Sequence, residues 1–418
     1  MRNEAGWSFL FDDNEPAINF KNELKYNFKR YIVDLLIIVP FLLSLIILFI
    51  YKKLRTPNLE KKILLGTVPI VTFYLLTKLL KQNGFNTTLF VFDDWSNGNF
   101  HNDISFSDIC KNKFLNKESY LFGPYISFLW ALNKFDIYTL YFNSGFLERT
   151  IFWRIEPIIY QLFNKKVILF PYGSDVWSIK QNSNRVQKLG HMMSLKKYFH
   201  LDKKIESRVY HWSKYVNLII ATVNYIDFLQ KIDILVYHGH IIDDINNKKY
   251  TYNFKNTDDI KIIHYANDKV RKGSNYIENS LKKSNNHINN LEFYYAEKRD
   301  VILSKLDSSH FYIEQLTDGF FSYSALEAMI KGKIVFLYLD ESINDMYKIV
   351  NSNYYIDFFD NSPIVNINLY NLEDRLIEYQ NKNFNELKEI SLKSREFAIK
   401  LLQENEKMYL KIFDRLVK

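Results

Sequence analysis

Residues 260–283 read IKIIHYANDKVRKGSNYIENSLKK, and this stretch contains the pattern from which the fold is predicted. Its first five residues form a mostly apolar run that is typical of a buried strand, and residues 275–283 have helical spacing. Between them lies a turn that contains Lys269, Arg271 and Lys272 and ends at Gly273. A strand that leads through a short turn into a helix is the repeating unit of a parallel sheet.

The same alternation extends in both directions along the chain. After residue 283, strands are expected at 291–295, 310–313 and 333–339, and helices at 301–306 and 321–330. Before residue 243, strands are expected at 62–66, 87–92, 137–142, 167–171 and 217–222, and helices at 69–82 and 148–163. Because the polar stretch 243–259 separates the two blocks, the sequence predicts two doubly wound α/β domains that face each other. The predicted domains span residues 60–240 and 241–395, followed by a C-terminal helix at 396–418.

The amino-acid composition excludes several classes of protein. The chain has 418 residues, 47% of them hydrophobic and 24% charged, as in globular proteins. Its single cysteine, Cys110, excludes a disulfide framework and a cysteine-based zinc cluster within one chain. A net charge of +8 over this length is mild, so a nucleic-acid partner is not expected.

Residues 31–51 read YIVDLLIIVPFLLSLIILFIY and predict a membrane helix. Residues 35–51 contain no charge, and the whole segment approaches the roughly 20 residues that cross a bilayer. A buried core helix is the alternative, but such helices rarely lack a polar face. The preceding segment, residues 1–30, is expected to be amphipathic and to end in basic residues, and its Lys21, Lys25 and Lys29 stripe suits a headgroup layer. An ordinary solvated amphipathic helix has the same spacing.

The orientation of this helix is open at the level of sequence. Basic residues flank it on both sides, so the positive-inside rule gives no direction. Pro40 lies at its centre and can kink it. A kinked span is the expectation, and a re-entrant helix with both ends on one side is the alternative.

Three stretches at strand-to-helix turns carry candidate chemistry. In 269-KVRKG-273, lysine ammonium groups and free N–H groups at a helix start suit a phosphate, although a solvated basic loop has the same composition. In 315-QLTDGFFSYSALEAM-329, Gly319 permits a tight turn, Ser322 can cap a helix, and Glu327 lies in an apolar run. A carboxylate there needs a partner, such as a ligand diol, unless it lies at a solvated helix edge.

The third stretch, 171-PYGSDV-176, places Tyr172 and Asp175 at the end of a strand, and Gly66 ends the first strand. Ordinary turn chemistry explains Gly, Ser and Asp equally well. The sequence contains no Asp-x-Asp, P-loop, GxGxxG, GxSxG or HExxH motif.

Together these motifs resemble those of GT-B glycosyltransferases, particularly the retaining, nucleotide-sugar-dependent enzymes of bacterial surface-polysaccharide assembly. Residues 269–273 are similar to the family's Arg-x-x-Lys-Gly pattern, which holds the donor diphosphate, with lysine in the arginine position. Residues 326–335 (LEAMIKGKIV) are similar to its Glu-Ala-Met segment, in which Glu327 corresponds to the acid that holds the ribose. The family's first acid falls at Gly319, beside Asp318, and Tyr172 replaces a histidine.

The resemblance implies two Rossmann-like domains and transfer of a sugar from a nucleotide sugar to an acceptor. The apolar segment at 35–51 predicts that this acceptor is a membrane-associated, lipid-linked glycan. The resemblance also implies retention, no metal and no further cofactor, with the catalytic domains in the cytoplasm. The implied catalytic residues are Tyr172 and Asp175, and the implied donor-binding residues are Gly66, Lys269, Lys272, Gly273, Gly319, Ser322 and Glu327. The alternative is a membrane-anchored, non-catalytic relative that acts as a binding partner or scaffold.

Overall fold

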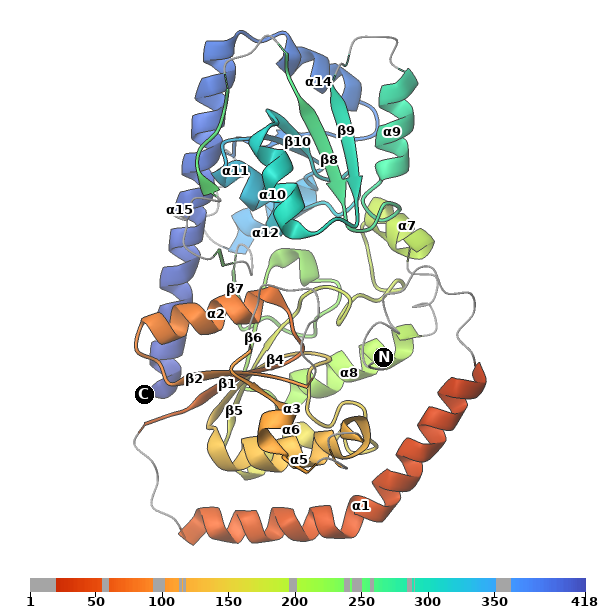
Figure 1. Ribbon diagram of the computed structural model, residues 1–418, viewed down its shortest axis with the longest axis vertical. Helices are drawn as coiled ribbons and strands as arrows, with labels where there is room; N and C mark the ends of the chain where they lie inside the picture. The colour runs from red at the N-terminus through yellow and green to blue at the C-terminus, as the bar shows by residue number, and fades with distance from the viewer. Residues whose placement is uncertain are drawn as a thin grey trace.

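The computed structural model describes residues 20–54, 60–92, 102–112, 115, 118–194, 201–236, 241–242, 250–255, 259–283, 288, 290–350 and 362–418. Within these ranges the chain forms two α/β domains, one above the other in Figure 1, and a long N-terminal helix. Residues 1–19 and most of the polar stretch between the domains lie outside the described residues. The expected fold class, two parallel sheets covered by helices, is confirmed.

The first domain is built on a seven-stranded parallel sheet with the order β3-β2-β1-β4-β5-β6-β7. Its strands are β1 (Ile63–Thr67), β2 (Thr87–Val91), β3 (Ile104–Ser105), β4 (Ile137–Tyr141), β5 (Lys166–Phe170), β6 (Leu218–Ala221) and β7 (Ile234–Leu235). Its helices are α2 (Val71–Gln82), α3 (Phe106–Ile109), α5 (Ser119–Lys134), α6 (Glu156–Leu162), α7 (Arg185–Ser194) and α8 (Asp202–Tyr215). A 3₁₀ turn, Val223–Tyr225, follows β6.

The second domain contains a five-stranded parallel sheet with the order β12-β11-β10-β8-β9. Its strands are β8 (Ile262–Ala266), β9 (Leu291–Tyr295), β10 (Phe311–Ile313), β11 (Ile334–Leu337) and β12 (Val365–Asn366). Its helices are α9 (Ser274–Lys283), α10 (Arg299–Asp307), α11 (Tyr323–Ile330), α12 (Glu341–Val350) and α14 (Leu372–Gln380). Because all strands run parallel, their carboxyl ends share one edge of the sheet, where α/β proteins bind ligands.

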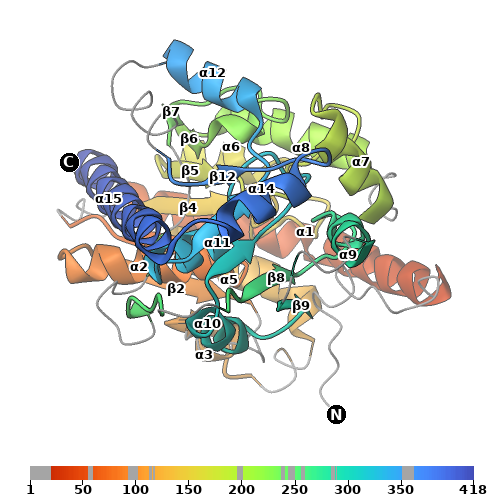
Figure 2. The same cartoon turned by 90° about the horizontal axis from the view of Figure 1, so that it is seen from above.

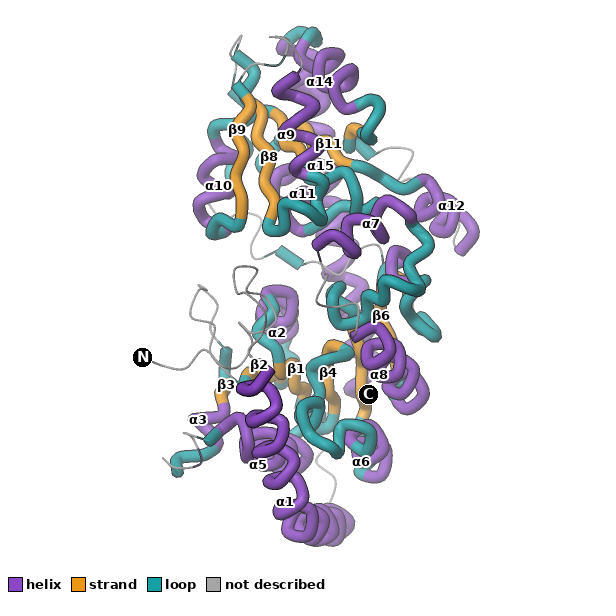
Figure 3. Tube along the Cα trace, turned by 90° about the vertical axis from the view of Figure 1, so that its right-hand side faces the viewer, coloured by secondary structure: helices purple, strands orange, loops and turns teal. Residues whose placement is uncertain are grey.

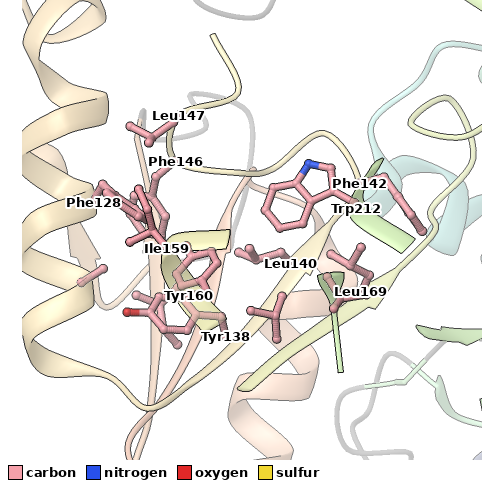
Figure 4. Close-up of a cluster of buried hydrophobic side chains, with 14 of the residues drawn as sticks. Phe128, Tyr138, Leu140, Phe142, Phe146, Leu147, Ile159, Tyr160, Leu169 and Trp212 are labelled. Carbon is pink, nitrogen blue, oxygen red and sulfur yellow. The ribbon is translucent and has the colours of Figure 1, made fainter. Parts of the chain in front are cut away.

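Aromatic side chains fill the space between the first sheet and the helices on one of its faces (Figure 4). The rings of Tyr138 on β4 and Tyr160 on α6 lie 4.4 Å apart, and both are fully buried. Phe128 of α5 packs edge-on against Tyr160 at 5.5 Å, and Trp212 of α8 joins the same cluster. Strands buried on both faces explain why the sequence shows continuous apolar runs rather than alternation.

The last helix, α15 (Phe384–Val417), joins the two domains, and Figure 1 shows it running along both (Figure 2 gives the view from above). The Asn383 side chain caps its start by accepting from the N–H of Glu386. In the second domain, Ser394 donates to the carbonyl of Lys333 at 2.9 Å. Farther along, Tyr409 and Phe413 belong to the core of the first domain. One rigid helix therefore fixes both domains.

The N-terminal helix α1 (Phe20–Leu54) lies beside α5 at the base of the first domain (Figure 3). Within Phe28–Leu54, its most apolar window has a mean hydropathy of 3.0 and is 11% buried. By length and composition this helix can cross a membrane. Pro40 lies inside it, as the sequence required.

One predicted helix differs from the structure. The sequence predicted a helix over 148–163, but residues 144–155 form turns and α6 begins at Glu156. The Glu156 carboxylate accepts hydrogen bonds from the N–H groups of Phe146 (2.8 Å) and Leu147 (2.7 Å). These bonds fold the residues before α6 back over the start of the helix. The apolar residues in that segment are spaced as in a helix because they are buried, although the segment itself is not helical.

Candidate active site

The basic turn of the second domain follows β8 and precedes α9. Asp268 organises it, because its Oδ1 accepts hydrogen bonds from the N–H groups of Val270 (3.1 Å) and Arg271 (2.9 Å). Gly273 closes the turn with φ at +74°, a region that side chains rarely adopt. The turn thereby directs Arg271 and Lys272 toward the carboxyl edge of the sheet.

Lys272 is buried in a cluster of carboxylates. Its Nζ lies 3.0 Å from Glu314 Oε1 and 3.5 Å from Asp318 Oδ2. Glu314 directly follows β10, is fully buried, and also accepts from the N–H of Ser322 at 3.0 Å. Ser322 is the N-cap residue of α11. The turn after β8, the end of β10 and the start of α11 therefore meet at the ammonium group of Lys272.

Arg271 extends this cluster toward the first domain. Its Nη1 lies 3.0 Å from Asp318 Oδ2, and its guanidinium lies 5.2 Å from the ring centre of Trp177. Burial works to raise the pKa of Asp318, but the charges of Arg271 and Lys272 outweigh it and hold that pKa below its usual value. Asp318 Oδ1 is buried with no hydrogen-bond partner among the described residues. A ligand donor can therefore bond there.

Helix α7 of the first domain packs against this turn. Gln187 Nε2 donates to the carbonyl of Asp318 at 3.2 Å, and Ser194 bonds Asp268. His191 packs at a tilt against Trp177 with ring centres 4.4 Å apart, and burial lowers the pKa of His191 to about 4. Neither ring nitrogen of His191 has a hydrogen-bond partner among the described residues. The imidazole is therefore neutral and available at the junction of the two domains.

Two predicted donor residues belong to neighbouring networks. Lys269 Nζ pairs with Glu278 Oε2 at 2.8 Å and lies 4.4 Å from the ring centre of Tyr295. Glu327 is buried in α11, where it accepts from Arg299 Nε at 2.8 Å and from the Tyr250 hydroxyl at 3.1 Å. Glu327 is thus paired and not at a solvated helix edge.

Gly319 lies where the domains touch. Its φ is +72°, and a Cβ atom there would lie 3.1 Å from Asp340 Cβ and 3.3 Å from Asn184 Nδ2. Asn184, just before α7, bonds Asp340, which follows β11. The position of the missing first acid is therefore occupied by a domain contact, and the neighbouring Asp318 supplies a carboxylate.

In the first domain, Asp175 lies beneath the turn that ends β5. It accepts hydrogen bonds from the N–H groups of Tyr172 (3.0 Å), Gly173 (2.9 Å) and Phe142 (3.2 Å). Burial is the main influence on its carboxyl and raises its pKa to about 6. The Tyr172 hydroxyl accepts from Asn143 Nδ2 at 2.7 Å, and burial raises its pKa. Asp175 therefore shapes the turn that presents Tyr172.

The loop after β4, residues 143–151, links Gly66 and Asp175 to one network. Ser144 Oγ donates to the carbonyl of Gly66 at 2.9 Å. Gly66 itself lies so close to Phe90 of β2 that a Cβ atom would meet its carbonyl oxygen. Glu148 Oε1 lies 3.0 Å from Arg208 Nη1, and Arg208 Nη2 donates to the carbonyl of Asp175 at 2.7 Å. Glu148 Oε2 and Arg208 Nε are buried with no hydrogen-bond partner among the described residues.

Sequence reasoning missed Glu314 and Arg208, and it placed Arg271 in the phosphate-binding turn without giving it a role of its own. Glu314 carried a usable signal, because it directly follows a predicted strand, whereas the partners of Arg271 and Arg208 come from distant segments. Among the described residues, no group of three or more His, Cys, Asp or Glu side chains is placed to hold a metal ion.

Comparisons with known proteins agree with this architecture. Neither a protein-family model nor a curated protein sequence matches the chain. Among solved structures, HepE of Anabaena in complex with UDP-glucose superposes with a TM-score of 0.51 and 11% identity, over 85% of this chain and 99% of that one. Sucrose-phosphate synthase from Thermosynechococcus elongatus gives 0.49 and 11%, over 85% and 100%. Starch synthase IV from Arabidopsis thaliana, with ADP and acarbose, gives 0.46 and 9%, over 86% and 99%. The likeness to HepE shows that the chain has the GT-B fold.

Proposed function

We propose that this protein is a glycosyltransferase that moves a sugar from a nucleotide sugar to a membrane-associated, lipid-linked glycan acceptor. The observation that carries the proposal is the pair of cations, Arg271 and Lys272, at the carboxyl edge of the second sheet. Lys272 is buried, the Arg271 side chain is 13% exposed, and the backbone of Arg271 lies against Gly190 of α7 in the first domain. The fold supports the same conclusion, since HepE shares it and was solved with UDP-glucose.

The donor diphosphate binds, in this proposal, at Arg271 and Lys272 and beside the N–H groups at Gly273. Phosphate oxygens replace the carboxylates of Glu314 and Asp318 as acceptors of the hydrogen bonds that Lys272 and Arg271 donate. The bond between the sugar C1 and the diphosphate oxygen breaks while C1 bonds to the oxygen of the acceptor hydroxyl, and the hydroxyl proton passes to the leaving diphosphate. Negative charge grows on the leaving diphosphate, and fixed cations stabilise it most at that moment. Protein cations thus serve where other enzymes use a metal, and retention of configuration is part of the proposal.

Glu327 is the proposed ribose ligand, because an ionised carboxylate can accept hydrogen bonds from both hydroxyls of a diol. Arg299 holds it in that state. Lys269, Gly319 and Ser322 complete the donor side. Tyr172 and Asp175 are the proposed catalytic residues of the first domain, with Gly66 beside them.

The acceptor side is proposed to be the first domain, and α1 is proposed to place it at a membrane. Nucleotide sugars are cytosolic, so the two domains are proposed to lie in the cytoplasm. A nucleic-acid partner and a resident metal are not part of this function.

Calorimetric titration with a panel of nucleoside diphosphates tests the donor site. Lys272→Met and Arg271→Ala are each expected to weaken binding of the preferred nucleotide at least tenfold, and Glu327→Gln to weaken it for ribonucleotides. Lys282→Ala is the matched control, because Lys282 is an exposed lysine on α9 of the same domain. Unchanged binding in Lys272→Met and Arg271→Ala, in protein with an unaltered circular dichroism spectrum, would refute the assignment.

A membrane-anchored, non-catalytic scaffold is favoured by one observation: both cations already have carboxylate partners. Release of nucleoside diphosphate from nucleotide sugars, with and without a polyprenyl-linked glycan, discriminates the two functions. Acceptor-dependent release supports the transferase. Tight nucleotide binding without any release supports the scaffold.

A further inference from the structure

The apolar helix α1 is fixed to the first domain near its start. Arg30 and Asp34, both buried, form an ion pair of 2.9 Å. Asp34 accepts hydrogen bonds from the Tyr125 hydroxyl (2.6 Å) and from the N–H of Ile151 (3.0 Å). Arg30 Nη1 donates to the carbonyl of Leu121 at 2.9 Å. These bonds join the helix to α5 and to the loop after β4.

The middle and far end of α1 are fixed as well. Phe41 is 2% exposed and packs edge-on against Tyr125 with ring centres 5.1 Å apart. Phe49 packs against Phe163, which follows α6, at 5.5 Å. The Lys52 ammonium donates to a backbone carbonyl at the end of α5. From Arg30 to Lys52 the helix is about 33 Å long at 1.5 Å per residue. That is about the thickness of the hydrocarbon core of a bilayer.

The opposite face of α1 is an apolar stripe. Leu36, Val39, Leu43, Ile46, Ile47 and Ile50 recur at intervals of one to four residues and are 53–72% exposed. A continuous exposed apolar stripe of this length marks an interaction surface, unlike single apolar residues scattered over a protein surface. Exposed lysines flank it at each end, Lys29 before it and Lys53 after it.

A helix that crosses the bilayer is incompatible with these contacts. Because its inner face is bound to the first domain from Arg30 to Lys52, a perpendicular α1 would draw the polar first domain through the hydrocarbon layer. Crossing without the domain would leave the Arg30–Asp34 pair without its partners on α5, in a medium where unpaired polar groups are costly. A helix parallel to the membrane keeps every contact and covers only the apolar stripe.

We propose that α1 lies in the plane of the membrane, with the apolar stripe in the acyl chains of one leaflet and Lys29 and Lys53 at its anionic headgroups. This differs from the kinked span expected from hydropathy. It rests on the membrane association in the proposed function but not on sugar transfer. It accounts for basic residues at both ends, because both ends then meet the same leaflet.

Depth measurements on the full chain test the orientation. Single cysteines replace Leu36, Leu43 and Ile50 in a Cys110→Ser background, and each carries a nitroxide label. The protein is added to preformed vesicles of phosphatidylcholine and phosphatidylglycerol, and collisions with oxygen and with a water-soluble nickel chelate give each label's depth. An in-plane helix places all three at one shallow depth, about 5–10 Å below the headgroups. Lys282→Cys, on the second domain, is the water-exposed control.

A different depth profile would overturn the proposal. A span or a re-entrant helix places the Leu43 label deepest, with the labels at positions 36 and 50 nearer the surface. A membrane-impermeant thiol reagent, applied outside the vesicles, then separates those two: in-plane and re-entrant helices expose both Lys29→Cys and Lys53→Cys, whereas a span protects one. Removing phosphatidylglycerol is expected to weaken binding, and indifference to it would refute the headgroup contact.

Absence of vesicle binding would overturn this inference together with the membrane part of the proposed function. Transfer to a detergent-solubilised acceptor reports the enzymatic part independently. The two failures are therefore distinguishable.

Discussion

Replacing Lys272 with methionine is expected to destabilise the second domain by about 3–5 kcal/mol, because it leaves a buried carboxylate without its charge partner. The side chains of Lys272 and Glu314 are 6% and 0% exposed, and the joining atoms lie 3.0 Å apart. Methionine preserves the unbranched shape of the lysine stem, so the change removes charge more than volume.

The magnitude follows from the geometry. At an effective dielectric constant of about 20, two unit charges at this separation attract by about 5 kcal/mol. The N–H of Ser322, 3.0 Å from Glu314, remains and offsets on the order of 1 kcal/mol. Glu314→Gln is expected to cost less, because Lys272 keeps Asp318 at 3.5 Å. The double variant is expected to cost about 2–3 kcal/mol less than the sum of the single variants.

Denaturation in urea measures these values if the two domains are followed separately. All six tryptophans lie at or before residue 212, so the second domain has no tryptophan of its own. The four described tryptophans lie in the first domain, and their fluorescence follows that domain and its contact with Arg271, whereas far-ultraviolet circular dichroism follows both domains. Lys282→Met is the control, because its exposed pair with Glu278 contributes less than about 1 kcal/mol. A cost below about 1 kcal/mol for Lys272→Met, or additive costs in the double variant, would refute the account of a desolvated pair.

Further predictions concern His264, Gly273 and Phe41. Burial lowers the pKa of His264 from 6.5 to about 4, so the unfolded chain takes up a proton first as pH falls. The contribution of His264 to the free energy of unfolding is therefore complete above pH 6.5 and decreases by about 1.4 kcal/mol per pH unit toward pH 4. In His264→Gln, the urea midpoint should fall less steeply as the pH is lowered through this range. Gly273→Ala, at a φ of +74°, is expected to cost about 1–2 kcal/mol in the same assay and to weaken nucleotide binding in calorimetry. Phe41→Ala is expected to cost about 3–5 kcal/mol in the fluorescence transition of the first domain, and a loss below 1 kcal/mol would show that α1 is not packed there.

The sequence predicts the long strands because helices cover both faces of each sheet, which gives these strands continuous apolar runs. The strand at 291–295 matches β9, and the strands at 87–92, 137–142 and 167–171 match β2, β4 and β5 within one residue at each end. Strands β3, β7 and β12 were missed, since two residues at or near a sheet edge carry no periodic signal. Helix α7 was missed for another reason: contacts with the other domain, and not its own apolar pattern, give it its place.

In the candidate site, too, features set by local sequence could be predicted, whereas contacts between distant segments could not. Local spacing identified the turn that ends at Gly273, because a glycine with positive φ between a strand and a helix is a local requirement. It did not identify which carboxylates would face the cations, since Glu314 lies 42 residues from Lys272 along the chain. Glu327 was predicted to need a partner, and Arg299 is that partner. Only the folded sheet brings such pairs together.

One loop connects helix α1 to the ends of the first sheet. Ile151 at one end of it donates to Asp34 of α1, and Ser144 at the other bonds the carbonyl of Gly66. Between them, Glu148 pairs with Arg208, which also holds the turn at Asp175. If α1 lies in the membrane plane, an acceptor that stays anchored by its lipid meets this loop before it reaches the cations of the second domain. Glu148 Oε2 and Arg208 Nε, which have no hydrogen-bond partner among the described residues, are then buried polar atoms beside that loop to which an acceptor could bond. In the proposed function, the position of α1 would then set the direction from which the acceptor approaches, and α15 holds the second domain, which carries the proposed donor site, to the first.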